Sequence, residues 1–150
     1  MPETESIAAV VGEWVKKAEN DLRSAQVLLG EKDDHLADII CFHAQQCVEK
    51  YFKALLVRHQ IPFPKTHGLS GLVNLLPVEY HDILSTDEQQ LMTKYATITR
   101  YPGDYEEISL SDAHGAVKTA ARVRKIVRSL LPKGALRRVG GKNKQGARNK

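Results

Sequence analysis

Apolar residues return along this chain at intervals of three and four, and this helical period is the feature that most restricts its fold. Strand-like alternation is scarce, and no internal repeat is visible. The spacing predicts two long amphipathic helices, at about residues 6 to 29 and 34 to 60, and a last long helix that ends at Pro132. Long helices joined by short connections favour an all-α fold, an up-and-down bundle of four to five helices.

Turn and cap residues set the expected ends of these helices. Gly30 is predicted to close the first helix in the left-handed conformation, which glycine adopts without a Cβ clash. A shorter third helix follows Thr66 and stops at Pro77. A serine followed three residues later by an acidic residue is typical of a capping box, which begins a helix. Two such pairs are expected to start a fourth and a last helix: Ser85 with Glu88, and Ser109 with Asp112.

The charge distribution divides the chain into a body and a tail. The chain has 150 residues and 42 % hydrophobic content, enough for one domain with a substantial core, which we place at residues 1–132. Residues 133–150 contain seven of the 22 basic residues and no acidic one, which leaves fifteen basic against 18 acidic residues in the body. We expect this basic tail to be disordered. It is interpreted either as a phosphate-binding segment or as a solubilising terminus.

The last helix continues the positive charge of the tail. Its basic residues have two interpretations: favourable contact with the negative end of the helix dipole, or a continuous positive surface for a polyanion or an acidic partner. These residues are Lys118, Arg122 and Lys125, with Arg124 and Arg128 adjoining.

The sequence also indicates where the protein works and what it lacks. No run approaches the ~18 to 20 apolar residues of a membrane span, and the N-terminus lacks the pattern of a secretory signal, so a cytoplasmic protein without membrane contact is expected. Cys41 and Cys47 are interpreted as small buried apolar residues. The six histidines show no metal-ligand spacing, and neither a metal nor another cofactor is expected.

One polar row crosses the most apolar region of the chain. Within FHAQQCVEKYFKAL, residues 42–55, four polar residues recur at steps of three, four and three. This polar seam consists of His43, Gln46, Lys50 and Lys53. A solvated outer helix face would explain it. Because Ile39 and Phe42 interrupt the polar arc, an interface or a polar cleft is the alternative interpretation.

Four segments carry a resemblance to a known family. KKAENDLRSAQVLL, CFHAQQCVEKYFKALLV, KTHGLSGLVNLL and TRYPGDY, in this order, closely resemble the HEPN domains over about residues 13 to 130. The resemblance implies a four- to five-helix bundle that usually dimerises. Members are often encoded beside a minimal nucleotidyltransferase, and some bind nucleotides.

Many HEPN proteins are metal-independent ribonucleases, and the resemblance implies where their motif would lie. That motif is an arginine followed, after four to six residues, by a histidine. Arg100 occupies the arginine position, but residues 105–107 are tyrosine and two glutamates, and the next histidine is His114. The ribonuclease motif is therefore incomplete, and no catalytic residue is assigned.

We therefore expect a homodimeric module that binds a nucleotide or a protein partner, with a minimal nucleotidyltransferase as the expected partner. A metal-independent endoribonuclease of toxin–antitoxin type, acting on RNA, and a dimeric scaffold without a ligand are the alternatives. The expected phosphate-binding residues are Arg100, Lys50, Lys53, His43, Gln46 and Tyr101, and the expected interface residues are Phe42 and Ile39.

Overall fold

The structure is a computed structural model, and it describes residues 3–65, 68–96 and 107–136. All regular elements in these ranges are helices, which confirms the all-α prediction. Three are long: α1 (Glu3–Leu29), α2 (Ala37–Arg58) and α5 (Leu110–Ser129). Two are short: α3 (Leu69–Leu75) and α4 (Thr86–Lys94). Two 3-10 helices, η1 (Asp34–Leu36) and η2 (Val78–Ile83), lie in the connections, and η2 was not predicted from the sequence.

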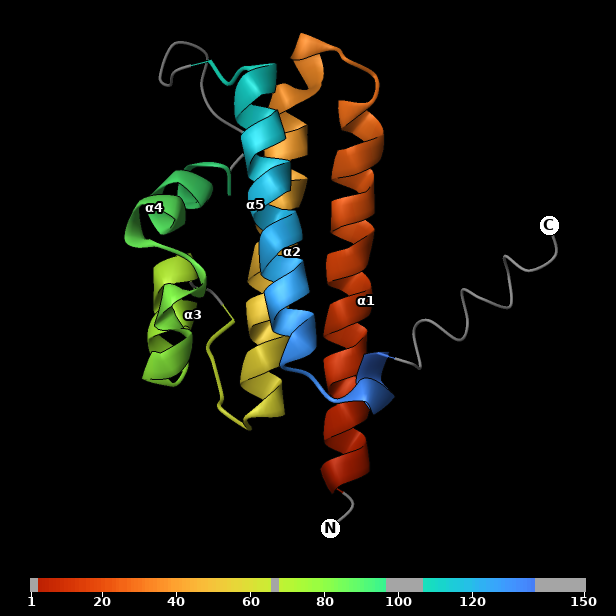
Figure 1. Cartoon of the computed structure of the whole chain (residues 1–150), viewed down its shortest axis with the longest axis vertical. Coiled ribbons are helices and arrows are strands. Elements are labelled where there is room, and N and C mark those ends of the chain that lie inside the picture. Colours follow the sequence, from red (N-terminus) through yellow and green to blue (C-terminus); the bar gives the residue numbers. More distant parts are fainter. Residues whose placement is uncertain (1–2, 66–67, 97–106, 137–150) are drawn as a thin grey trace, which may run out of the picture.

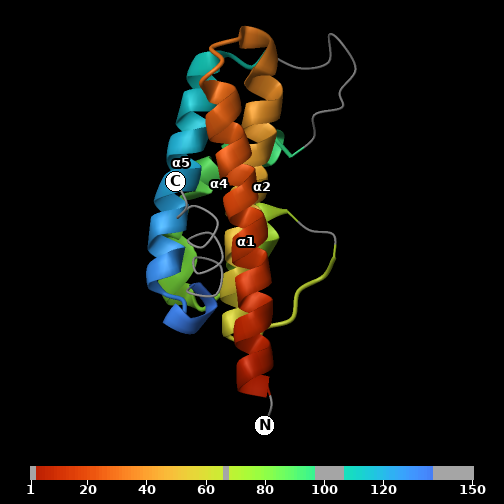
Figure 2. The ribbon, with the colours of Figure 1, turned by 90° about the vertical axis from the view of Figure 1, so that its right-hand side faces the viewer.

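The three long helices lie side by side, with α1 antiparallel to both α2 and α5 (Figure 1). Figure 2 shows α1 nearest to the viewer, with α3 and α4 behind α2 and α5. Helix α2 contacts all four other α-helices and is the centre of the fold. The short pair α3 and α4 therefore covers the side of the bundle that α1 leaves open.

The central position of α2 explains why its sequence is so apolar. Its largest buried side chains, Tyr51 and Phe52, are fully inaccessible to solvent. No residue from Ala37 to Val57 is exposed; each is buried or half-buried. A helix enclosed in this way loses the polar outer face of an ordinary amphipathic helix.

The helix starts follow the predicted capping chemistry. Ser85 accepts a hydrogen bond from the backbone N–H of Glu88 at 3.1 Å, while the Glu88 carboxylate accepts from the Ser85 N–H at 2.9 Å. The same reciprocal pair joins Ser109 and Asp112 at the start of α5. Both boxes satisfy backbone donors that would otherwise lack partners.

The predicted left-handed glycine after α1 is wrong. Lys32, two residues later, has a φ of 54° and makes the left-handed turn. Gly30 instead continues the helical turn, because its N–H donates to the carbonyl oxygens of Gln26 and Val27 at 3.2 Å. The chain therefore leaves the helix after the glycine.

The packed bundle continues past Pro132 to Ala135, which is fully buried. Most of the predicted tail, residues 137–150, lies outside the described residues. Within the described part of the chain, none of the helices has a stretch both long and apolar enough to cross a lipid bilayer.

Candidate functional site between the three long helices

Two carboxylates of α1 point to opposite sides of the helix and organise the polar residues of α2 and α5. Glu19 and Asp21 are two positions apart, so they project about 200° apart around the helix axis. The apolar stripe that faces the core lies between them. Glu19 therefore reaches α5, and Asp21 reaches the polar seam on α2.

Asp21 joins two residues of the polar seam. Its Oδ2 accepts a hydrogen bond from the Lys50 ammonium at 2.5 Å, and its Oδ1 lies 2.9 Å from His43 Nδ1. A carboxylate only accepts, so this ring nitrogen of His43 carries the hydrogen. The three side chains are mostly buried: 12 % of Asp21, 23 % of Lys50 and 26 % of His43 is exposed.

A second carboxylate, Glu49 of α2, organises the other two seam residues. Glu49 Oε1 accepts from the Gln45 amide at 3.0 Å, and Gln46 donates to the Gln45 amide oxygen at 2.7 Å. The other carboxylate oxygen of Glu49, Oε2, lies 3.5 Å from the Lys53 ammonium. The seam therefore forms two internal polar clusters.

Lys53 is also enclosed by aromatic rings. Its Nζ lies 5.0 Å from the centroid of the Trp14 indole and 5.8 Å from that of Phe63, distances at which a cation is attracted to a ring face. Lys53 thereby links the segment after α2, which carries Phe63, to Trp14 of α1.

The solvated-face interpretation of the polar seam is wrong, because its side chains are largely covered and have partners within the fold. Arg100 and Tyr101 lie outside the described residues, so a phosphate site that unites them with Lys50 and Lys53 stays a prediction. Ile39 and Phe42 are half-buried, and their role in an interface also stays a prediction.

Glu19 is the centre of a cluster that joins all three long helices. It accepts a hydrogen bond from the Tyr51 hydroxyl of α2 and another from Arg124 Nε of α5 at 2.7 Å. Arg128, one turn further along α5, lies 3.5 Å from the same carboxylate oxygen. Burial, together with the hydrogen bond to Glu19, raises the pKa of Tyr51, and the same carboxylate raises the pKa of Arg124.

A third basic residue of α5 joins the bundle to α4. Arg122 donates to both carboxylate oxygens of Glu88 at 2.8 Å and to the carbonyl oxygen of Ile83 at 3.0 Å. The hydrogen bonds from Arg122 lower the pKa of Glu88. Arg122, Arg124 and Arg128 are thus held by carboxylates. Of the basic residues predicted to form a positive surface on α5, Lys118 and Lys125 are exposed, and the three arginines are paired with carboxylates.

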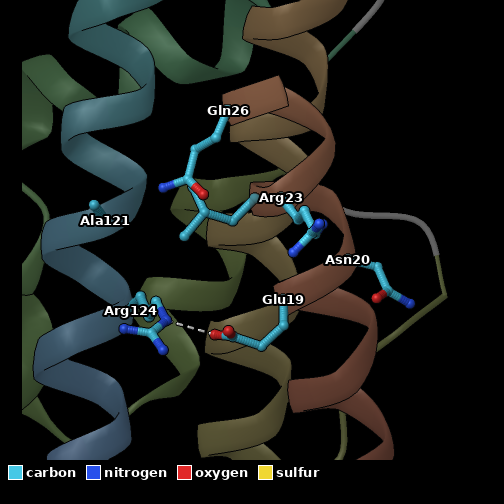
Figure 3. Close-up of a pocket in the computed structure, with 7 residues that line it drawn as sticks. Glu19, Asn20, Arg23, Gln26, Ala121 and Arg124 are labelled. Carbon is cyan, nitrogen blue, oxygen red and sulfur yellow. Dashed lines mark hydrogen bonds and ion pairs between the residues drawn. The ribbon is translucent and has the colours of Figure 1, made fainter. Parts of the chain in front are cut away.

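An open groove of about 490 Å³ runs between α1 and α5 beside the Glu19 cluster. Figure 3 shows Glu19 and Gln26 reaching from α1 towards α5, where Arg124 meets Glu19. We call this the α1–α5 groove, and its lining residues are Glu19, Asn20, Leu22, Arg23, Gln26, Ala121 and Arg124.

The sequence-based reasoning missed the carboxylates that organise these clusters, Glu19 and Asp21. Two signals were available. Acidic residues two positions apart cannot both lie on the polar face of an amphipathic helix. A tyrosine at a predicted core position, here Tyr51, also needs a hydrogen-bond partner for its hydroxyl. In the described part of the chain, no three histidine, cysteine, aspartate or glutamate side chains are grouped to hold a metal ion.

Known proteins resemble this chain in sequence over most of its length. The family model described as "HEPN domain" matches residues 11–130. A relative from Methanocaldococcus jannaschii named "Putative toxin MJ1304" is 32 % identical over 134 residues, which span 79 % of this chain and 86 % of that protein.

Two solved structures share the arrangement of helices. The crystal structure of TT1696 from Thermus thermophilus has a TM-score of 0.68 and 25 % identity, covering 82 % of this chain and 99 % of that one. The structure of ST0689, described as an archaeal HEPN homologue, has a TM-score of 0.59 and 27 % identity, covering 81 % of this chain and 98 % of that one.

Proposed function

The chain belongs to the HEPN domain family, and from this premise we propose that it is the toxin-like member of a two-protein pair. In this proposal it binds nucleotide phosphate and acts together with a minimal nucleotidyltransferase. The observation that carries the proposal is the similarity to a relative named a putative toxin, which extends over 86 % of that relative.

The charges of the polar seam leave the principal phosphate contact to another residue. Asp21 and Glu49 neutralise the two lysines of the polar seam, so the seam offers no unpaired cation for a phosphate. We assign the principal phosphate contact to Arg100, because a guanidinium can bind phosphate through two parallel hydrogen bonds. Tyr101 is its neighbour in the sequence.

Calorimetric titration of the full chain with nucleoside triphosphates tests this proposal. We expect saturable heat for the wild-type protein, clearly weakened binding for Arg100→Ala, and unchanged binding for Arg58→Ala. Arg58→Ala is a matched control, because it removes the same charge from an exposed residue in the last turn of α2. Equal binding by all three proteins would contradict the role of Arg100, and absence of heat from the wild type would contradict nucleotide binding.

The proposed pairing with a minimal nucleotidyltransferase has its own test. We expect the product of a neighbouring nucleotidyltransferase gene to co-purify with the untagged chain and to relieve any growth arrest that the chain causes when expressed alone. A neighbouring gene of another kind, or separate elution of the two proteins, would argue against the pair.

A metal-independent endoribonuclease is the second candidate, and the name of the relative favours it. The residues present oppose it, because Glu106 and Glu107 stand where the motif histidine is expected and their carboxylates would repel a phosphodiester. This candidate predicts RNA cleavage in EDTA that Arg100→Ala abolishes. RNA that stays intact in the presence of pure protein would exclude it.

We also propose that the chain forms a homodimer through Ile39 and Phe42. Both are large apolar residues that remain half-buried on the otherwise enclosed α2. Light scattering should then show that Phe42→Asp is a monomer. The ligand binding of this variant should be unchanged. A dimer of unchanged mass would place the contact elsewhere.

A further inference from the structure

We propose that the α1–α5 groove is a second phosphate-binding site, which holds the phosphates of a nucleotide or of an RNA strand through Arg23 and Arg124. The class of ligand rests on the proposed function. The location does not, because every lining residue belongs to the described part of the chain and none belongs to the segment that carries Arg100.

Both arginines of the groove keep N–H donors available for a ligand. Arg23 is exposed and forms no hydrogen bond or ion pair with the described residues. Arg124 donates its Nε to Glu19, but no hydrogen bond of the described residues uses its two terminal amino groups. A guanidinium has five N–H donors, so Arg124 can be held by Glu19 and still bind an anion.

The contact with Glu19 positions Arg124 at the wall of the groove. Glu19 itself is fixed by the hydroxyl of Tyr51, which is fully buried. The hydrogen bond from Arg124 Nε to Glu19, at 2.7 Å, therefore holds the guanidinium in place before a ligand arrives. An arginine ordered in this way loses less conformational entropy on binding than a free surface lysine does.

Further positive charge lies along both walls of the groove. Lys118 and Lys125 are three residues before and four residues after the lining residue Ala121, so they project from the same side of α5, and both are exposed. Lys16 precedes Arg23 by two helical turns on α1 and is exposed as well. Glu19 is the sole carboxylate among the lining residues, and it is already paired. The groove therefore attracts anions.

The remaining lining residues favour phosphates over other anions or partners. None of the described residues that line the groove is aromatic, so they offer a base no stacking platform. Recognition therefore falls to the phosphates of an RNA backbone or of a free nucleotide. Leu22 and Ala121 offer little apolar area, whereas an interface with a protein is usually anchored by large buried side chains. Gln26, which points towards α5 in Figure 3, adds an amide group that can donate to phosphate oxygens.

Two variants test the groove and keep every residue of the Glu19 cluster in place. Arg23→Gln removes the cation that has no partner among the described residues. Ala121→Glu adds a carboxylate at a half-buried position of the lining. Glutamate has a favourable helix propensity, so the substitution is compatible with α5. Arg58→Gln is the charge-matched control, because it makes the same substitution on an exposed residue outside the groove.

The measurement is fluorescence anisotropy of the full-length chain with a labelled single-stranded RNA and, separately, with a labelled nucleoside triphosphate, at several salt concentrations. We expect Arg23→Gln to weaken binding about tenfold, the loss of one charge-assisted hydrogen bond, and to lower the salt slope by about one for RNA. Ala121→Glu should weaken binding further, and Arg58→Gln should match the wild type.

The outcomes separate this inference from the proposed function. A loss confined to RNA identifies a strand as the ligand, and a loss confined to the triphosphate identifies a free nucleotide; both support the site. If Arg23→Gln and Ala121→Glu bind both probes as Arg58→Gln does, the groove is not a phosphate site. If Arg100→Ala still weakens triphosphate binding in that case, the proposed function stands and only the groove assignment fails.

Discussion

Replacing Asp21 by asparagine is expected to lower the free energy of unfolding by about 2 kcal/mol. Asp21 accepts from Lys50 at 2.5 Å and from His43 at 2.9 Å. Removal of one partner from a fully buried ion pair costs about 3 to 5 kcal/mol, and an exposed pair contributes about 1 kcal/mol or less. The lysine and aspartate side chains are 23 % and 12 % exposed, which places this pair between the two limits.

Urea unfolding followed by far-ultraviolet circular dichroism measures the effect. With a slope of about 2 kcal/mol per molar urea, a loss of about 2 kcal/mol moves the midpoint by about 1 M. A double-mutant cycle with Lys50→Met isolates the pair, and we expect a coupling free energy of at least about 1 kcal/mol. Glu13→Gln, an exposed change on the same helix, should alter stability by less than about 0.5 kcal/mol.

Two results would refute the reasoning. A midpoint for Asp21→Asn that matches the Glu13→Gln control would mean that the polar seam behaves as an ordinary solvated surface. Additive effects in the cycle would mean that Lys50 and Asp21 lie close together without stabilising one another.

The remaining predictions concern the other clusters. Tyr51→Phe should destabilise the fold by about 1 to 2 kcal/mol, because the Glu19 carboxylate loses a buried donor; an unchanged urea midpoint would contradict this. Arg122 lowers the pKa of Glu88, so the pair contributes stability above the unfolded-state pKa, and this contribution is lost as the pH falls through the lower folded-state pKa. Glu88→Gln should therefore reduce the melting temperature at neutral pH and flatten its acid dependence, whereas parallel acid profiles would count against the pair. Burial raises the pKa of Cys41 to about 12 and that of Cys47 as well, so a thiol reagent at mildly alkaline pH should label neither until the chain unfolds, and rapid labelling of the native protein would disprove their enclosure.

Local features of the fold were predictable because they depend on neighbouring residues. The spacing of apolar positions located the three long helices, and the serine–acid pairs at Ser85 and Ser109 located the starts of α4 and α5. Gly30 shows the limit of this approach. Its residue type favours a left-handed turn, but the chain makes that turn at Lys32.

The candidate site was predicted only in part, because its partners come from different helices. The sequence indicated that His43 and Lys50 share one side of α2, but it did not reveal that Asp21, more than twenty positions earlier, faces them. It also offered no way to see that Arg124 is paired while Arg23 is left available. Such facts depend on how α1 is rotated against α2 and α5, and a single sequence does not specify this rotation.

The hydrogen bond between Glu19 and Arg124 joins positions 105 residues apart, and this distance constrains how the protein is made. During translation, Glu19 and Tyr51 leave the ribosome long before their arginines exist. A nascent chain that ends before α5 has an incompletely covered central helix and a carboxylate without its guanidinium. Its apolar surface is then open to aggregation or to chaperones. Completion of the bundle must therefore wait for the last helix, and synthesis that stops early yields no partial version of this protein with a closed core.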